Sequence, residues 1–183
     1  MNLVFFLEEP SARALLEGLL PTLLPTSIDV RFVVFEGKQD LEKNLVRKLN
    51  GGLAPDSRFI VLRDQDGADC RVVKQKLTSL VGSSGREALV RVACRELESW
   101  VLGDMLALSD EFDEPKLRSN STKAKFREPD DLGNPVQELQ RLIPSYQKID
   151  GARRMGKRLD PETNASTSFR VFCEGVRRLA YEG

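Results

Sequence analysis

The sequence predicts an α/β fold in which helices flank a four-stranded parallel sheet, followed by a helical C-terminal extension. Apolar runs rich in β-branched and aromatic residues alternate with amphipathic segments of about a dozen residues, which is typical of βαβ units. The expected strands are apolar along most of their length, as strands are when helices cover both faces of a sheet. After about Cys94 this alternation gives way to helices and polar loops.

The first half of the chain supplies four strands and the helices between them. The strands are expected in LVFFL, IDVRFVVFEG, RFIVL and EALVRVAC, at residues 3–7, 28–37, 58–62 and 87–94. A helix starts at Pro10, because proline favours the first helical turn, and a second over 38–49 stops at Asn50. A third helix is expected over 69–82, where apolar residues recur at helical spacing.

The second half is expected to be mostly helical. The predicted helices cover 95–112, 134–143, 146–159 and 166–183, and residues 110–134 are polar and without a clear period. Ser166 or Ser168 would cap the last helix, with Phe169, Phe172, Val176 and Leu179 as its buried stripe. We therefore divide the chain into an α/β core over 1–105 and a helical extension over 106–183 that packs on it.

Composition excludes several classes of chemistry. The 183 residues include 28 Lys or Arg, 28 Asp or Glu and no histidine. The absence of histidine removes Ser-His-Asp and Cys-His catalysis and nearly every zinc site. The N-terminus predicts no signal peptide and no membrane span. Three scattered cysteines indicate reduced thiols in a cytoplasmic protein.

Carboxylates follow all four expected strands. They are Glu8 and Glu9 after the first, Glu36 after the second, Asp64, Asp66 and Asp69 after the third, and Glu96 and Glu98 after the fourth. The carboxyl ends of parallel strands meet at one edge, where ligands bind. Crowded carboxylates would raise one another's pKa unless a cation neutralised them. Oxygen donors without His or Cys favour Mg²⁺ or Mn²⁺.

The same acids are also compatible with purely structural roles and with a different chemistry. The three aspartates can form a turn and a helix cap, and Glu8 and Glu9 can interact with the dipole of the first helix. Glu96 and Glu98 can be exposed residues of a helix. The phrase VLRDQDG also matches the Asp-x-Asp-Gly of haloacid dehalogenase phosphatases, which leaves a phosphatase or phosphotransferase as an alternative. A calcium loop that starts at Asp64 fails, because Ala68 and Gln75 occupy its fifth and twelfth positions.

Two phrases resemble the Toprim domain of primases, topoisomerases and certain nucleases. That domain has a glutamate after its first strand and Asp-x-Asp after its third, and here FFLEEPSA and FIVLRDQD stand in those places. The phrase VVFEGKQDL is similar to the Toprim Glu-Gly-Lys-x-Asp but follows the second strand. The resemblance therefore places the Toprim glutamate at Glu8, with Glu9 and Glu36 as the alternative positions.

A wider set of phrases resembles one uncharacterised bacterial Toprim-like family. These phrases are EEPSARALLEGLLP, FEGKQDLEKNL, VLRDQDGADC, RVACRELESWVLGD and SFRVF. Members of that family often lie beside AAA/ABC-type ATPases in phage-defence loci and are distant relatives of OLD-type nucleases. The resemblance implies a metal-dependent nuclease that works with an ATPase subunit as the effector of an anti-phage system. A non-catalytic Toprim-like subunit that binds nucleic acid or docks on an ATPase is the alternative.

The resemblance also implies roles for individual residues. Glu8, Asp64 and Asp66 would hold one or two Mg²⁺ ions, with Glu96 and Glu98 as further ligands. Water on the metal, Lys38 or Lys74 would act as the base. Arg63, Arg95 or Lys38 would stabilise charge on the phosphate.

A basic segment points to nucleic acid. Residues 115–158 contain eleven Lys or Arg against five Asp or Glu, an excess of six positive charges. The densest part holds Lys148, Arg153, Arg154, Lys157 and Arg158. These side chains could follow a phosphate backbone, and a solvated helix face is the structural alternative.

Overall fold

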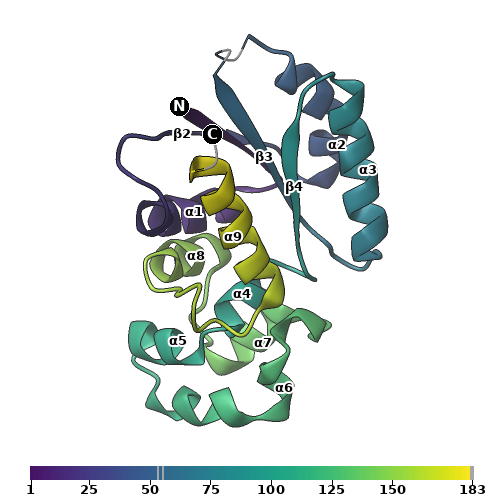
Figure 1. The fold of residues 1–183 in the computed structure, drawn as a ribbon. Helices are drawn as coiled ribbons and strands as arrows, with labels where there is room; N and C mark the ends of the chain where they lie inside the picture. The colour runs from purple at the N-terminus through teal and green to yellow at the C-terminus, as the bar shows by residue number, and fades with distance from the viewer. Residues whose placement is uncertain (53, 55, 182–183) are drawn as a thin grey trace.

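The computed structural model describes residues 1–52, 54 and 56–181 of the chain. Its centre is a parallel sheet with the strand order β2-β1-β3-β4 (Figure 1). The strands are β1 (Asn2–Leu7), β2 (Asp29–Val34), β3 (Ser57–Asp64) and β4 (Ala88–Ala93). The parallel four-stranded sheet predicted from the sequence is confirmed.

Three helices connect the strands and cover both faces. They are α1 (Pro10–Leu23), α2 (Lys38–Leu49) and α3 (Cys70–Ser83). Helices α2 and α3 lie on one face, and α1 lies with later helices on the other (Figure 1). A hydrophobic core lies on each face of the sheet, and alternate residues of each strand point into one core or the other. Phe5 faces α1, and Phe6 faces α2. The order of the strands reverses between β1 and β3, and this reversal is the switch point at which open α/β sheets bind ligands.

The second half forms a series of short helices and one longer helix, α9, which lie below and beside the sheet (Figure 1). They are α4 (Glu98–Leu102), α5 (Met105–Phe112), the 3₁₀ helix η1 (Pro115–Thr122), α6 (Ala124–Arg127), the 3₁₀ helix η2 (Pro129–Asp131), α7 (Pro135–Leu142), α8 (Lys148–Gly156) and α9 (Thr167–Tyr181).

The single helix expected over 95–112 is wrong. The chain breaks at Gly103, whose carbonyl accepts a hydrogen bond of 2.8 Å from the Ala165 backbone. Asp104 then caps a new helix, since its side chain accepts from the Ala107 N–H at 3.0 Å. At the start of α9 the Phe169 N–H donates to the Ser166 hydroxyl at 3.1 Å, so Ser166 is the capping serine.

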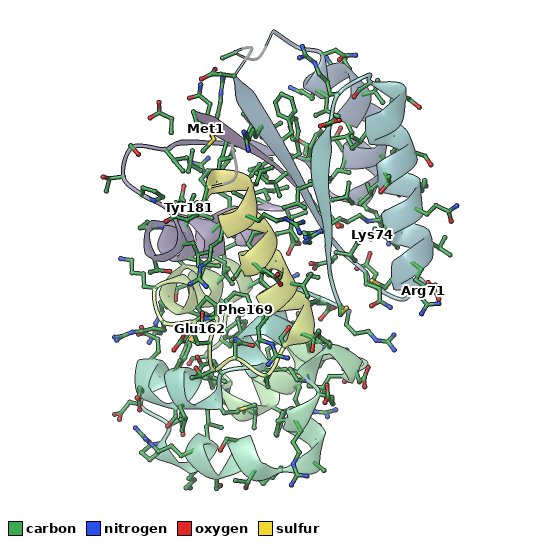
Figure 2. All side chains as sticks on the ribbon, in the orientation of Figure 1. Met1, Arg71, Lys74, Glu162, Phe169 and Tyr181 are labelled. Carbon is green, nitrogen blue, oxygen red and sulfur yellow. The ribbon has the colours of Figure 1, made fainter. Side chains whose placement is uncertain are left out.

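One large core joins the α1 face of the sheet to the C-terminal helices. Trp100 of α4 packs against Phe169 and Phe172 of α9, with ring centroids 5.3 and 5.0 Å apart. Figure 2 shows Phe169 on the inner side of α9. The division at residue 105 stays a prediction.

The cysteines Cys70, Cys94 and Cys173 are all free thiols. No helix within the described part of the chain is both long and apolar enough to cross a bilayer.

Candidate functional site at the carboxyl end of the sheet

The candidate site lies at the switch point, where β1 and β3 end side by side. Glu8 follows β1 directly, and Asp64 is the last residue of β3. The Asp64 backbone N–H donates to Glu8 Oε2 at 3.2 Å, which ties the two strand ends together. The acids expected after the first and third strands are therefore neighbours in the folded chain.

The two-residue repeat of a strand sends neighbouring side chains to opposite faces. Arg63 turns toward α2, where it contacts Glu42 at 2.5 Å and Glu8 at 3.6 Å. Asp64 turns the other way, toward Glu9 and Glu98, which act on its charge. The carboxylates thus fall into two groups, one on each face of the sheet. Arg63 belongs to the group on the α2 face, and Asp64 belongs to the group on the opposite face.

Asp64 is a carboxyl group in an unfavourable place. Its side chain is 9% exposed, and it accepts no side-chain hydrogen bond within the described residues. Burial raises the pKa of Asp64 well above its usual value, and the charges of Glu98, Glu9 and Glu8 raise it further. Such a group needs a proton or a cation nearby.

Glu98 is a second buried carboxyl group, and it comes from the start of α4. It is the first residue of α4 and only 1% exposed, and both carboxylate oxygens lack a hydrogen-bond partner among the described residues. Burial raises the pKa of Glu98 to about 7, although Lys148 opposes the shift. Two unsatisfied oxygens in a buried carboxylate are costly, which points to a missing cation or proton.

Lys148 brings a positive charge into this group. Its Nζ lies 3.1 and 3.4 Å from the two oxygens of Glu9 and 3.8 Å from Glu98. Burial lowers the pKa of Lys148, but Glu98 and Glu9 outweigh this and raise it to about 12. From the sequence, Lys148 is expected to bind a phosphate backbone together with the other basic residues of 148–158. Its contact with Glu9 is not predicted, because 139 positions separate the two residues.

Asp66 meets a second lysine at the outer part of the edge. Lys38, the first residue of α2, places its Nζ 3.0 Å from Asp66 Oδ2. Asp66 itself takes a left-handed conformation with φ 56°, and its N–H donates to the Arg95 carbonyl at 2.7 Å. Lys38 therefore reaches the candidate site, whereas Lys74 lies exposed on α3 (Figure 2).

Three further acids lie outside the candidate site. Two of them, Asp69 and Glu96, form structural hydrogen bonds, and Glu36 is exposed. Asp69 caps α3 by accepting from the N–H groups of residues 71 and 72 at 2.7 and 3.2 Å. Glu96 accepts from the Val136 N–H at 3.1 Å, which anchors the start of α7. The Glu36 side chain is exposed and forms no ion pair in the described part of the chain. The choice among Glu8, Glu9 and Glu36 as the Toprim glutamate stays a prediction.

The remaining basic residues gather elsewhere. Arg153, Arg154, Lys157 and Arg158 line a pocket of about 470 Å³ together with Glu111. Glu111 binds Arg154 at 3.0 Å and Arg158 at 2.8 Å, so this one carboxylate already pairs with two of the four cations. Arg154 also lies over the Phe112 ring, 4.0 Å from its centroid.

The chemistry of the donors fits a hard divalent cation. All are carboxylate oxygens, and those of Glu98 have no hydrogen-bond partner among the described residues. Within those residues no three His, Cys, Asp or Glu side chains are already gathered around one point. A cation here would draw in carboxylates that now lie on the two sides of the edge.

Comparisons with known proteins agree with this fold. The chain superposes on the C-terminal region of the Burkholderia pseudomallei OLD protein with a TM-score of 0.53 and 17% identity, over 97% of this chain and 98% of that one. This likeness confirms the predicted Toprim-like fold class. No curated protein matches the sequence. A family model matches residues 7–177, and the chain therefore belongs to DUF4276, a family described as a domain of unknown function.

Proposed function

We propose that this protein is a Mg²⁺- or Mn²⁺-dependent phosphodiester hydrolase, a nuclease of Toprim type. The observation that carries the proposal is a pair of buried carboxyl groups at the carboxyl end of the sheet. Both oxygens of Glu98 lack a hydrogen-bond partner among the described residues, and burial raises the pKa of Asp64 well above its usual value. A fold does not retain such groups for stability, because each raises the free energy of the folded state at neutral pH. Carboxyl groups with strongly shifted pKa values are concentrated at functional sites.

Each residue near the edge has a role in this proposal. Glu8, Asp64 and Asp66 would hold one or two ions, with Glu98 as a further ligand, and Glu96 could join them only by giving up its hydrogen bond from the Val136 N–H. A bound divalent ion supplies Lewis-acid activation of water and of the phosphoryl oxygen. Lys38 and Lys148 already pair with acids of the site, and both can turn to a phosphate oxygen when a cation takes over those acids.

The substrate in this proposal is a polynucleotide. Arg153, Arg154, Lys157 and Arg158 form a concentrated positive surface that phosphates can reach. Exposed Lys157 has no partner among the described residues, and Arg153 has only a long contact of 3.8 Å with Asp150. These two cations are free to bind phosphate without first releasing Glu111.

The biological setting is part of the same proposal. The sequence resembles a Toprim-like family found beside AAA/ABC-type ATPases in phage-defence loci, and the fold resembles the C-terminal region of an OLD protein. We infer a nuclease effector that works with an ATPase partner against phage.

The decisive experiment is cleavage of DNA and RNA with Mg²⁺ or Mn²⁺ by wild type and Asp64→Asn. The isosteric change removes the charge at the switch point, so we expect cleavage to fall by about 10³-fold or more. Asp56→Asn is the matched control, because Asp56 is an exposed aspartate at the opposite end of the same strand. Equal cleavage by wild type and Asp64→Asn would refute the proposal.

One observation favours a non-catalytic module as the second candidate. The Lys148 ammonium already neutralises part of the acid group, contacting both Glu9 and Glu98. In such a module this lysine would stand where an ion is otherwise needed. Nucleic-acid binding that is unaffected by Asp64→Asn, with no cleavage by either protein, would support this candidate.

A further inference from the structure

The free edge of the sheet offers a surface separate from the candidate site. Strand β2 ends the strand order and, among the described strands, pairs with β1 alone. The Asp29 N–H donates to the Met1 carbonyl and the Phe35 N–H to the Leu7 carbonyl, so odd-numbered residues bond inward. The N–H and C=O groups of Val30 and Phe32 therefore point outward, since backbone groups alternate sides along a strand. No backbone partner for them exists in the described part of the chain.

An apolar groove runs beside this edge. It lies between the second half of α1 and β2, has a volume of about 350 Å³, and is lined by Leu16, Leu20, Leu24, Ile28, Val30 and Phe32 among others. Val30 is 36% exposed, and its side chain points to the same face as Phe32. An unpaired edge with an apolar groove beside it is a surface that monomeric proteins usually protect with charged side chains, proline or a bulge. Strand β2 has no proline, and its two charged residues, Asp29 and Arg31, are opposite in sign and can therefore attract a second strand as well as repel one.

We propose that β2 pairs antiparallel with β2 of a second copy of this chain, with the twofold axis at Val30. The charges on the strand select this register. Asp29 and Arg31 flank Val30, are both exposed, and form no ion pair among the described residues. A twofold axis at Val30 sets each Asp29 opposite Arg31 of the other copy, whereas an axis at Arg31 would set like charges together.

The backbone agrees with the same register. Val30 has outward-pointing N–H and C=O groups, so the two copies exchange both bonds at Val30. Asp29 and Arg31 then fall at positions without hydrogen bonds, where opposite Cα atoms lie about 4.5 Å apart and side chains are closest. The Phe32 N–H would donate to the Ile28 carbonyl of the other copy. The pairing ends at this position, because the Ile28 N–H already donates to the Pro25 carbonyl of its own chain at 3.1 Å.

The register also joins the two grooves. Ile28, Val30 and Phe32 share one face, so each lies opposite an apolar residue of the other copy. The result is a continuous eight-stranded sheet. Because the strands of the two copies run in opposite directions, the candidate sites at their carboxyl ends lie at opposite ends of the strands. A stable dimer needs about 800 Å² buried per partner, so the grooves must contribute beyond the strands themselves.

The test is a charge exchange measured by sedimentation equilibrium over a wide range of concentrations. We expect wild type to dimerise, and Asp29→Arg alone or Arg31→Asp alone to raise the dissociation constant about tenfold or more. The double variant D29R/R31D should dimerise like wild type, because the twofold axis recreates both pairs with exchanged signs. Wild type that stays monomeric, or single variants that dimerise unchanged, would overturn the proposal.

A backbone variant gives an independent check. Val30→Pro removes one outward N–H and no bond to β1, so the monomer should keep its circular dichroism while the dimer is lost. Val30→Thr is the matched control, since it keeps the N–H and the branched side chain. If Val30→Pro fails to fold, the charge exchange still decides.

Discussion

Glu98 is, with Asp64, one of two buried carboxyl groups through which the stability of the fold depends on pH. Its pKa lies at about 7 in the folded chain, against an ordinary 4.5. The folded state holds the proton more tightly, so this stabilisation is complete below 4.5 and is lost as pH rises toward 7. The loss is on the order of 3 kcal/mol. Glu98→Gln should remove this dependence and be the more stable protein above the folded pKa.

The measurement is the free energy of unfolding against pH, in the presence of a chelator. Glu174→Gln on the exposed side of α9 is the matched control and should follow wild type. Identical pH profiles for wild type and Glu98→Gln would contradict the unfavourable burial of this carboxylate.

Lys148 gives a second prediction at the scale of single residues. In Lys148→Met the buried Glu98 loses a cation at 3.8 Å, and Glu9 loses one at 3.1 Å. We expect a loss of about 1–3 kcal/mol above the pKa of Glu98, kept modest because Lys148 is partly exposed. Because an ion would then replace the missing ammonium, Mg²⁺ should raise the melting temperature more in the variant than in wild type.

The control for Lys148→Met is Arg153→Met on the same helix. In the part of the chain that the structure describes, Arg153 pairs with exposed Asp150 alone, at 3.8 Å, so its loss should leave both stability and the Mg²⁺ effect near wild type. A Mg²⁺ effect that is equal in wild type and in Lys148→Met would mean that the lysine and the ion do not compete.

At the scale of elements, the contact between α1 and α8 positions Lys148. A Cβ on Gly156 would lie 2.1 Å from the Leu15 carbonyl oxygen, and one on Gly18 would lie 2.8 Å from the Gly156 backbone. The helices meet backbone to backbone at this point, and Lys148 meets Glu9 where both helices begin. The two helices therefore run in the same direction, and both N-termini face the acids.

Gly156→Ala should force these helices apart. We expect a loss of about 1–3 kcal/mol in chemical denaturation, because the obstacle is backbone that cannot move aside. Gly133→Ala is the matched control, since a Cβ there meets nothing within 4 Å. A Gly156→Ala protein as stable as the control would show that α8 can shift freely on α1.

At the scale of the whole molecule, one core crosses the predicted division at residue 105. Phe5 of β1 and Leu15 of α1 share a cluster with Met155 of α8 and Phe172 of α9. A chain of residues 1–105 alone would expose this apolar face to water. We expect that fragment to unfold without a cooperative transition, and a separately added 106–183 fragment to restore one. Cooperative unfolding of 1–105 alone would show that it is an independent domain.

The sequence by itself determined the parallel sheet, its strand-and-helix order and the carboxylates at the strand ends. These are local properties, because apolar periodicity and helix-breaking residues act over a few positions. Apolar periodicity alone did not reveal the break at Gly103, which rests both on the local cap by Asp104 and on bonds from a segment sixty positions away, around Asn164 and Ala165.

Only the tertiary structure decided which of the strand-end residues meet. The pleat of β3 separates Arg63 from Asp64, and the packing of α8 on α1 carries Lys148 to Glu9 across 139 positions. Glu96 is likewise held by a distant partner, the Val136 N–H, whereas the bond of Asp69 is a local cap at the start of α3. Charges act through space and not along the chain, so burial and long-range neighbours set the pKa of Glu98, whereas the sequence could give only its place after a strand.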